Sequence, residues 1–163
     1  MKTLPMRPQK SKNPPRSCTN IKYYRRGYVG MAISMNSKDL VKRGFSEPVD
    51  LKEGGQSQIP SKIGVYVIIR KDKEIDYPMG KSDIVKIGKC EETGKGFTGI
   101  WCDYLNSGTA QDAGKRTRQG PSRDLHAFSW LELPRNQIKQ VEKRLLNEFV
   151  RFHGQYPPFN LAH

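Results

Sequence analysis

The run Gly64-Val65-Tyr66-Val67-Ile68-Ile69 is rich in β-branched residues and predicts a β-strand. A second run, Ile84-Val85-Lys86-Ile87, predicts another strand, which Gly88 closes. The charged residues 71–74 fall between the two runs and indicate a turn. Because two short strands with a connection of this length favour antiparallel pairing, the sequence predicts a hairpin with an enlarged loop.

The residues after this hairpin predict two helices and a third strand. Apolar side chains share one side of a helix over 99–106, and residues 127–133 alternate as a strand does. The strongest helix spans 135–153, where apolar residues recur every three or four positions until Gly154 ends it. The expected fold class is α+β, with a small antiparallel three-stranded sheet flanked by helices.

The segment before the hairpin predicts a basic extension. Residues 1–26 hold eight basic residues, no acidic residue and several prolines, so we expect an extended arm that can lie along a phosphate backbone. Residues 36–44 predict a short helix, capped by Asn36 or Ser37 and ended by Gly44.

The overall charge indicates a polyanionic partner. The 163 residues include 29 Lys and Arg against 16 Asp and Glu, a net charge of +13, which favours DNA or RNA through counterion release. A solubility surface or a ribosome-associated protein is the alternative. We expect residues 1–58 to form a basic arm and a short helical DNA-binding extension, and residues 59–163 to form the main domain.

Basic residues in this extension and in the polar loop expected over 107–124 are the candidates for contact with double-stranded DNA. They are Arg25, Arg26, Lys38, Lys42, Arg43, Arg116 and Arg118.

The cysteines and the hydropathy pattern predict a cytoplasmic protein. Cys18, Cys90 and Cys102 lack the spacing of a zinc site and indicate free thiols in a reducing compartment. No apolar run approaches the roughly 18 residues of a membrane span, and the N-terminus has no apolar signal core, so no membrane association is expected.

The order of these segments resembles the GIY-YIG nuclease domain family over roughly residues 59–163. Gly64-Val65-Tyr66 is similar to its first motif, and Lys86-Ile87-Gly88 is similar to a Val-Lys-Ile-Gly variant of its second, with Gly64 and Gly88 as structural support. The resemblance implies an endonuclease of restriction or phage type that hydrolyses DNA phosphodiester bonds with Mg²⁺ (or Mn²⁺).

The resemblance also implies roles for single residues. Tyr66 would be an active-site phenol that helps to activate water, Tyr104 would stand where the family has a second-helix His or Tyr, and Glu142 would bind the metal. Asn160, which follows two prolines, would lock the C-terminal tail by side-chain hydrogen bonds and support Glu142.

The chemistry of hydrolysis gives these residue types a physical meaning. A positioned water, a group to take its proton and a cation to meet developing charge are all needed, and one carboxylate can hold Mg²⁺ together with waters and phosphate oxygens. Glu142 directly follows the apolar Val141, so it borders the buried side of its helix and can reach the sheet. The alternative is an exposed glutamate paired with Lys139 or Lys143.

Alternation along the first strand leaves two interpretations of Tyr66. Tyr66 and Ile68 share one face, while Val65, Val67 and Ile69 share the other, and at least one face must be core. Tyr66 is therefore either a core residue or a catalytic phenol, which would need nearby positive charge to act as a base at neutral pH.

Two positions depart from the family pattern. Lys86 replaces a tyrosine, and it can contact phosphate, lower the pKa of a tyrosine, or be a solvated strand residue. The usual catalytic arginine would fall at Ile100, and no arginine occurs between Arg70 and Arg116. The candidates for a substitute cation are Lys89, Lys95, Arg116 and Arg118.

The missing arginine defines the alternative hypothesis. A substitute cation would preserve an endonuclease, whereas its absence would leave a catalytically impaired fold that acts as a DNA-binding or interaction module. A third hypothesis, a small RNA-binding or ribosome-associated protein, rests on charge, and the one hint of aromatic stacking platforms is Tyr23, Tyr24 and Tyr28 beside Arg25 and Arg26. The sequence leaves the oligomeric state open, a homodimer included.

Overall fold

The computed structural model describes residues 35–52, 54–106 and 125–160. The chain divides into two units, Met1–Met31 and Ala32–His163, and all described residues belong to the second. They form an α+β fold with a four-stranded sheet in the order β1-β6-β2-β5 and a separate β3–β4 hairpin, and every strand pair is antiparallel.

The predicted fold class and antiparallel pairing are confirmed, but the prediction of three strands was wrong. The sheet consists of β1 Val49–Asp50, β2 Gly64–Arg70, β5 Ile84–Cys90 and β6 His126–Glu132. The additional strand β1 pairs with β6 along two residues only. So short a strand leaves no period-two alternation to detect.

The connection between β2 and β5 contains the small hairpin. Its strands are β3 Ile75–Tyr77 and β4 Gly80–Ser82, so the enlarged loop expected from the sequence has regular structure of its own. Short 3₁₀ turns, η2 Gly55–Gln58 and η4 Pro158–Asn160, lie before β2 and after the last helix.

Among the described residues, three helices accompany the sheet. The long helix α4 spans Arg135–His153, as predicted, and Gly154 ends it with φ of 79°. In α1, Ser37–Lys42, the cap is Asn36, whose side chain accepts a hydrogen bond from Asp39 N at 3.1 Å.

Helix α2, Gly96–Asn106, begins earlier than the predicted residue 99. Gly96 and Gly99 have low helix propensity, which conceals the first turn in the sequence. An added Cβ at Gly96 would lie 2.7 Å from Lys62 N and 2.6 Å from Ser61 C, so this position requires glycine for close backbone approach.

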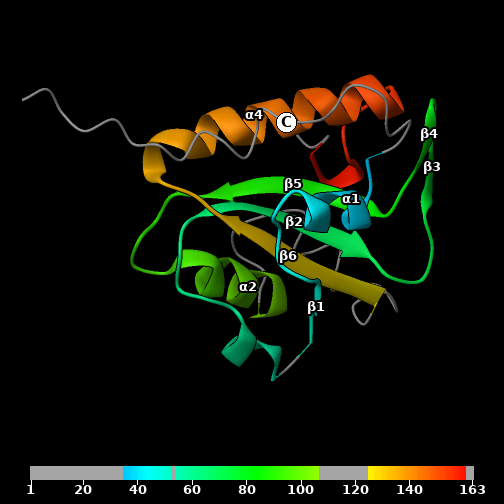
Figure 1. Cartoon of the computed structure of the whole chain (residues 1–163). Coiled ribbons are helices and arrows are strands. Elements are labelled where there is room, and N and C mark those ends of the chain that lie inside the picture. Colours follow the sequence, from blue (N-terminus) through cyan, green and yellow to red (C-terminus); the bar gives the residue numbers. More distant parts are fainter. Residues whose placement is uncertain (1–34, 53, 107–124, 161–163) are drawn as a thin grey trace, which may run out of the picture. The chain divides into compact units, whose positions relative to one another are not determined.

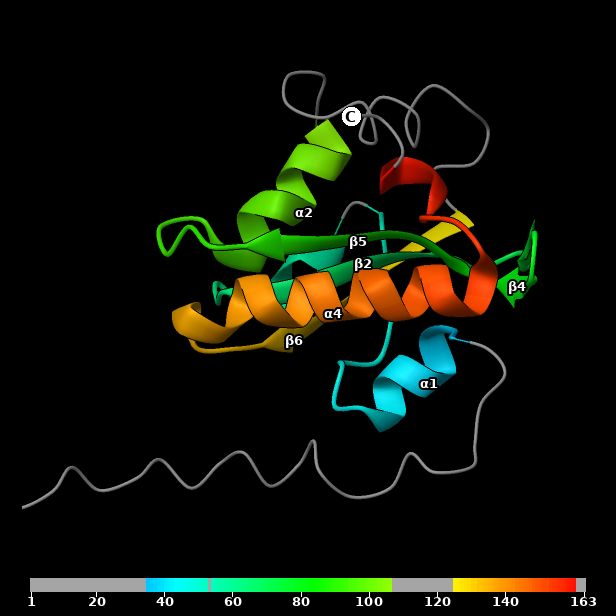
Figure 2. The ribbon, with the colours of Figure 1, turned by 90° about the horizontal axis from the view of Figure 1, so that it is seen from above.

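The helices cover both faces of the sheet. Figures 1 and 2 show α4 and α1 side by side on one face and α2 on the other. Accordingly, β2 is buried on both faces: Val65, Val67 and Ile69 pack with residues of α4, whereas Tyr66 and Ile68 pack with residues of α2. The predicted alternation is confirmed, and both faces are core.

Helix α1 and strand β1 share this core with the later elements. Leu40 of α1 is fully buried in the cluster under α4, and Val49 of β1 packs against the cluster under α2. Within the described residues, no helix has both the length and the apolar character that crossing a membrane would require.

Candidate active site at the edge of the sheet

Tyr66 is a buried phenol that reaches across the backbone of the edge strand β5. Its ring stacks on Phe128 at a centroid distance of 5.3 Å, and only 2% of the residue is exposed. Tyr66 pairs with Gly88 in the register of β2 and β5. An added Cβ at Gly88 would lie 2.5 Å from Tyr66 Cζ, so glycine at this position leaves the space that the phenol occupies.

Tyr104 of α2 lies against Tyr66. The two rings meet edge to face with centroids 6.2 Å apart, and Tyr104 is 3% exposed. The buried Tyr104 Oη forms no hydrogen bond of normal geometry with a described residue, although it interacts with the Tyr66 hydroxyl. A buried hydroxyl whose hydrogen bonding is incomplete costs free energy, so this atom is a candidate for contact with a ligand or water.

Burial controls the acidity of both phenols. It raises the pKa of Tyr66 to about 12; the hydrogen-bonding interaction with the Tyr104 hydroxyl lowers that pKa and the negative charge of Glu142 raises it. Burial likewise raises the pKa of Tyr104 well above its ordinary value. Both phenols are therefore protonated at neutral pH in the free protein. The effect of Glu142 on the pKa of Tyr66 shows that the two side chains are within electrostatic reach of each other.

Glu142 projects from α4 toward the same edge strand. Its side chain is 20% exposed, and its Oε2 lies 3.6 Å from Lys89 Nζ on β5. Burial raises the pKa of the Glu142 carboxyl, Lys89 lowers it, Glu91 raises it and Lys86 lowers it. Glu142 is thus a half-buried carboxylate that pairs across to the sheet, and its partner is neither Lys139 nor Lys143.

Lys89 lies between two carboxylates. Its Nζ is 3.6 Å from Glu91 Oε2 as well as from Glu142 Oε2. The sequence interpretation did not include Glu91. Its spacing of two residues from Lys89, at the end of a strand, was the signal that could have placed both side chains on one side.

The C-terminal tail closes the outer edge of β5. The Asn160 side chain accepts a hydrogen bond from Ile87 N at 2.9 Å and donates one to Ile87 O at 2.7 Å. It therefore satisfies backbone groups that an edge strand would otherwise present to solvent. This contact fixes the tail to β5, beside the strand residues that face Glu142.

Lys86 is half-buried between the tail and the site. Its Nζ donates a hydrogen bond to Phe159 O at 3.3 Å. Burial lowers the pKa of the Lys86 ammonium, and the charge of Glu142 raises it. Lys86 therefore supplies a partly desolvated positive charge within electrostatic reach of Glu142, and it is not a fully solvated strand residue.

Gly64 is required by packing at the start of the first motif. An added Cβ there would lie 2.0 Å from Leu131 O on β6 and 2.9 Å from Phe97 Cζ on α2. Because β2 packs this closely against β6 and α2 at Gly64, a larger residue there would displace β2 and, with it, Tyr66.

No described residue of α2 or β5 is an arginine. Ile100 packs against the aromatic cluster under α2, and Lys95 is exposed just before that helix. Two of the predicted substitutes, Arg116 and Arg118, lie outside the described residues. The lysines Lys86 and Lys89 are the cations that the structure brings next to Glu142.

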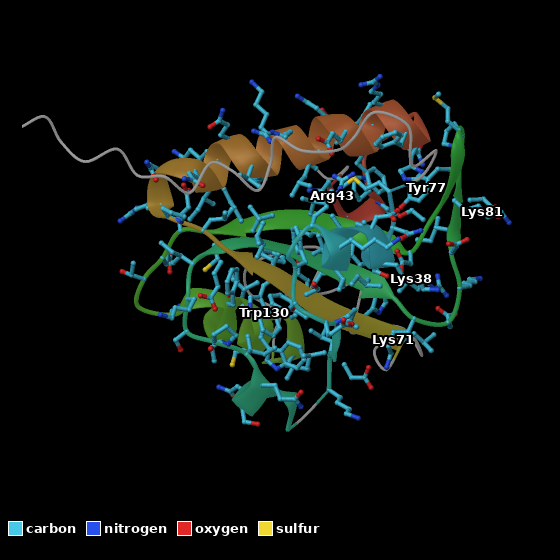
Figure 3. The ribbon with its side chains drawn as sticks, in the orientation of Figure 1. Lys38, Arg43, Lys71, Tyr77, Lys81 and Trp130 are labelled. Carbon is cyan, nitrogen blue, oxygen red and sulfur yellow. The ribbon has the colours of Figure 1, made fainter. Side chains whose placement is uncertain are left out.

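The residues predicted to contact DNA have different surroundings. Lys38 is exposed, and Lys42 is exposed with a 3.6 Å ion pair to Asp39. Arg43 is 12% exposed and donates to Glu148 Oε2 at 2.6 Å, between α1 and α4 (Figure 3). Arg25 and Arg26 lie outside the described residues.

The donor set limits the metals that this site can hold. No cluster of three or more His, Cys, Asp or Glu side chains suited to a metal occurs in the described ranges. Glu142, with Glu91 nearby, therefore offers one or two carboxylates. That number suits Mg²⁺ or Mn²⁺ with substrate oxygens and waters, rather than an ion held by protein alone.

Comparison of the chain with protein-family models, curated protein sequences and solved structures found no match.

Proposed function

We propose that this chain is a divalent-metal-dependent DNA endonuclease of the GIY-YIG type that hydrolyses phosphodiester bonds at the edge of β5. The observation that carries the proposal is the half-buried Glu142, paired with Lys89 and within electrostatic reach of the buried Tyr66. The motif resemblance implies a glutamate, a cation and this phenol in one site. In the fold, Glu142 of α4 and Tyr66 of β2 both approach the edge strand β5, which carries Lys89.

Hydrolysis would require each of these groups for a separate task. Water oxygen forms a bond to phosphorus, the bond from phosphorus to one sugar oxygen breaks, water loses a proton and the leaving oxygen gains one. Tyr66, protonated because burial raises its pKa to about 12, would orient the water by hydrogen bonding. A cation approaching Tyr66 would lower its pKa and favour the phenolate, which could then accept the proton that the water loses.

Glu142 would hold the metal ion, and a bound Mg²⁺ or Mn²⁺ would supply charge for the phosphate oxygens. Its raised pKa reflects a carboxylate with incomplete compensation, which a divalent cation would relieve. Lys89 would still pair with Glu91 if Glu142 bound the metal ion. Lys89 and Lys86 would then stabilise the developing negative charge in place of the usual arginine.

Cleavage of supercoiled plasmid by the full-length protein tests the proposal. With Mg²⁺ or Mn²⁺ present we expect nicked or linear DNA, and Glu142→Ala should lower the rate by about a hundredfold or more, as loss of a group that stabilises transition-state charge does. Glu132→Ala, which removes an exposed carboxylate at the end of β6, is the matched control and should keep the rate. Intact plasmid with every metal, or equal rates for the wild type and Glu142→Ala, would refute the proposal.

A second candidate function is a DNA-binding module without catalysis. It is favoured by the absence of arginine from α2 and by the Lys89–Glu142 pair, which occupies the carboxylate. DNA binding that weakens with salt, together with intact plasmid under all metals, would select this function over the endonuclease.

A further inference from the structure

The outward side of α4 has an unusually uniform composition. Every exposed residue of this helix is basic or carries a side-chain amide, and none is acidic. The exposed cations are Arg135, Lys139, Lys143, Arg144 and Arg151, and together they form what we call the basic face. The remaining exposed residues of α4 are asparagine or glutamine, which also donate hydrogen bonds.

The two glutamates of α4 do not neutralise this face. Both are partly buried. Glu142 pairs with Lys89 of β5, and Glu148 pairs with Arg43, which follows α1. Four of the five cations, Arg135, Lys139, Lys143 and Arg151, form no ion pair with any residue in the described part of the chain. The positive charge of the helix is therefore displayed outward.

The basic face is long enough for several phosphates. Lys139, Lys143 and Arg151 are spaced by multiples of four, so they lie on one inclined row that winds partly around the helix, which rises about 18 Å over those twelve steps. A shallow hollow between Lys143 and Arg151 is also lined by Gln140, Arg144, Asn147 and Glu148, and the carboxylate of Glu148 pairs with Arg43. Figure 3 shows nitrogen-tipped side chains projecting from α4 away from the sheet.

Two other occupants fit this face poorly. The apolar side of α4, with Ile138, Val141 and Leu145, is buried in the core, so no apolar surface of the helix is left to enter a bilayer. A second copy would be repelled, because the same face of its α4 carries the same positive charge.

We propose that the basic face of α4 binds the phosphate backbone of duplex DNA. The choice of DNA as the polyanion rests on the proposed function, whereas the binding itself requires no catalysis. Lys139 lies three residues before Glu142, so these side chains are neighbours on the helix surface. A strand held along the basic face would therefore lead directly to the candidate active site.

The test measures the binding of the full-length protein to a short fluorescent duplex in EDTA, across a range of salt concentrations. The variant Lys139→Ala/Lys143→Ala/Arg151→Ala removes three charges from the basic face and introduces a good helix former at each position. The matched control, Lys52→Ala/Lys62→Ala/Lys73→Ala, removes three exposed charges from other elements.

The proposal predicts a loss that only the basic-face variant shows. Its affinity should fall at least tenfold at about 0.15 M salt, and its slope of log K against log salt should fall by roughly 2–3, since each phosphate contact contributes about 0.9. The control should lose less than about twofold.

Two results would overturn the proposal: unchanged DNA affinity in the basic-face variant, or equal losses in both variants. Plasmid that stays intact with the wild type, together with a selective loss of DNA affinity in the basic-face variant, would refute only the endonuclease.

Discussion

A buried tyrosine lies on each side of the sheet, and the two differ in the hydrogen bonding of their hydroxyls. Under α4, Tyr77 is 7% exposed and its Oη donates to Ile84 O at 2.7 Å. Under α2, Tyr104 is 3% exposed and its Oη forms no hydrogen bond of normal geometry in the described part of the structure. Burial raises the pKa of both phenols, so burial alone does not distinguish them. The difference in hydrogen bonding indicates that Tyr77 is structural and that Tyr104 is available to a ligand.

The largest effect on stability is expected at Gly88, where the Tyr66 ring fills the space that a side chain would need. In Gly88→Ala, the new Cβ would meet the Tyr66 ring, so either the ring or the strand must move. Overpacking of this kind costs about 1–3 kcal/mol. We expect a lower free energy of unfolding in urea and, because Tyr66 is displaced, loss of plasmid cleavage. Wild-type stability in Gly88→Ala would show that the ring does not cross β5 as described.

A smaller effect separates the two phenols directly. Tyr77→Phe deletes a buried hydrogen bond and leaves Ile84 O without this donor, so the free energy of unfolding should fall by about 1–2 kcal/mol. Tyr104→Phe removes a hydroxyl that forms no hydrogen bond of normal geometry with the described residues, so its stability should equal or exceed that of the wild type.

Parallel urea melts of Tyr77→Phe and Tyr104→Phe provide the measurement, and each variant is the control for the other. A loss of stability in Tyr104→Phe as large as that in Tyr77→Phe would contradict the distinction between the two faces.

The smallest effect concerns pH on the α4 face. His153 is fully buried, and burial lowers the pKa of its imidazole, whereas a hydrogen bond with the Met35 backbone raises it. Because the folded state holds the proton less tightly than the unfolded state, stability should fall as pH drops below about 6.5 toward the lowered pKa. His153→Gln should lose this component, so the difference in unfolding free energy between variant and wild type should change across that range. A difference independent of pH would show that His153 does not titrate on unfolding.

Much of the fold could be predicted from the sequence because its signals are local. The apolar periodicity of α4 and the β-branched runs of β2 and β5 each dominate a continuous segment. Strand β1 escaped prediction because two residues carry no periodicity and its pairing with β6 is long-range.

The site was harder to predict, because it depends on which side chains the fold brings to β5. Position on the helix indicated that Glu142 faces the sheet, but the sequence could not identify Lys89 as its partner. The missing hydrogen bond at Tyr104 Oη is likewise a property of packing and has no trace in the sequence.

The most direct test of the central claim compares plasmid cleavage by Tyr66→Phe and Tyr77→Phe in the presence of Mg²⁺. We predict that Tyr66→Phe loses about a hundredfold or more of the rate, as removal of a group that handles the proton does, with its fold intact. Tyr77→Phe should keep the wild-type rate under conditions in which it stays folded. Wild-type cleavage by Tyr66→Phe, or equal losses in both variants, would contradict the assignment of the α2 face to chemistry.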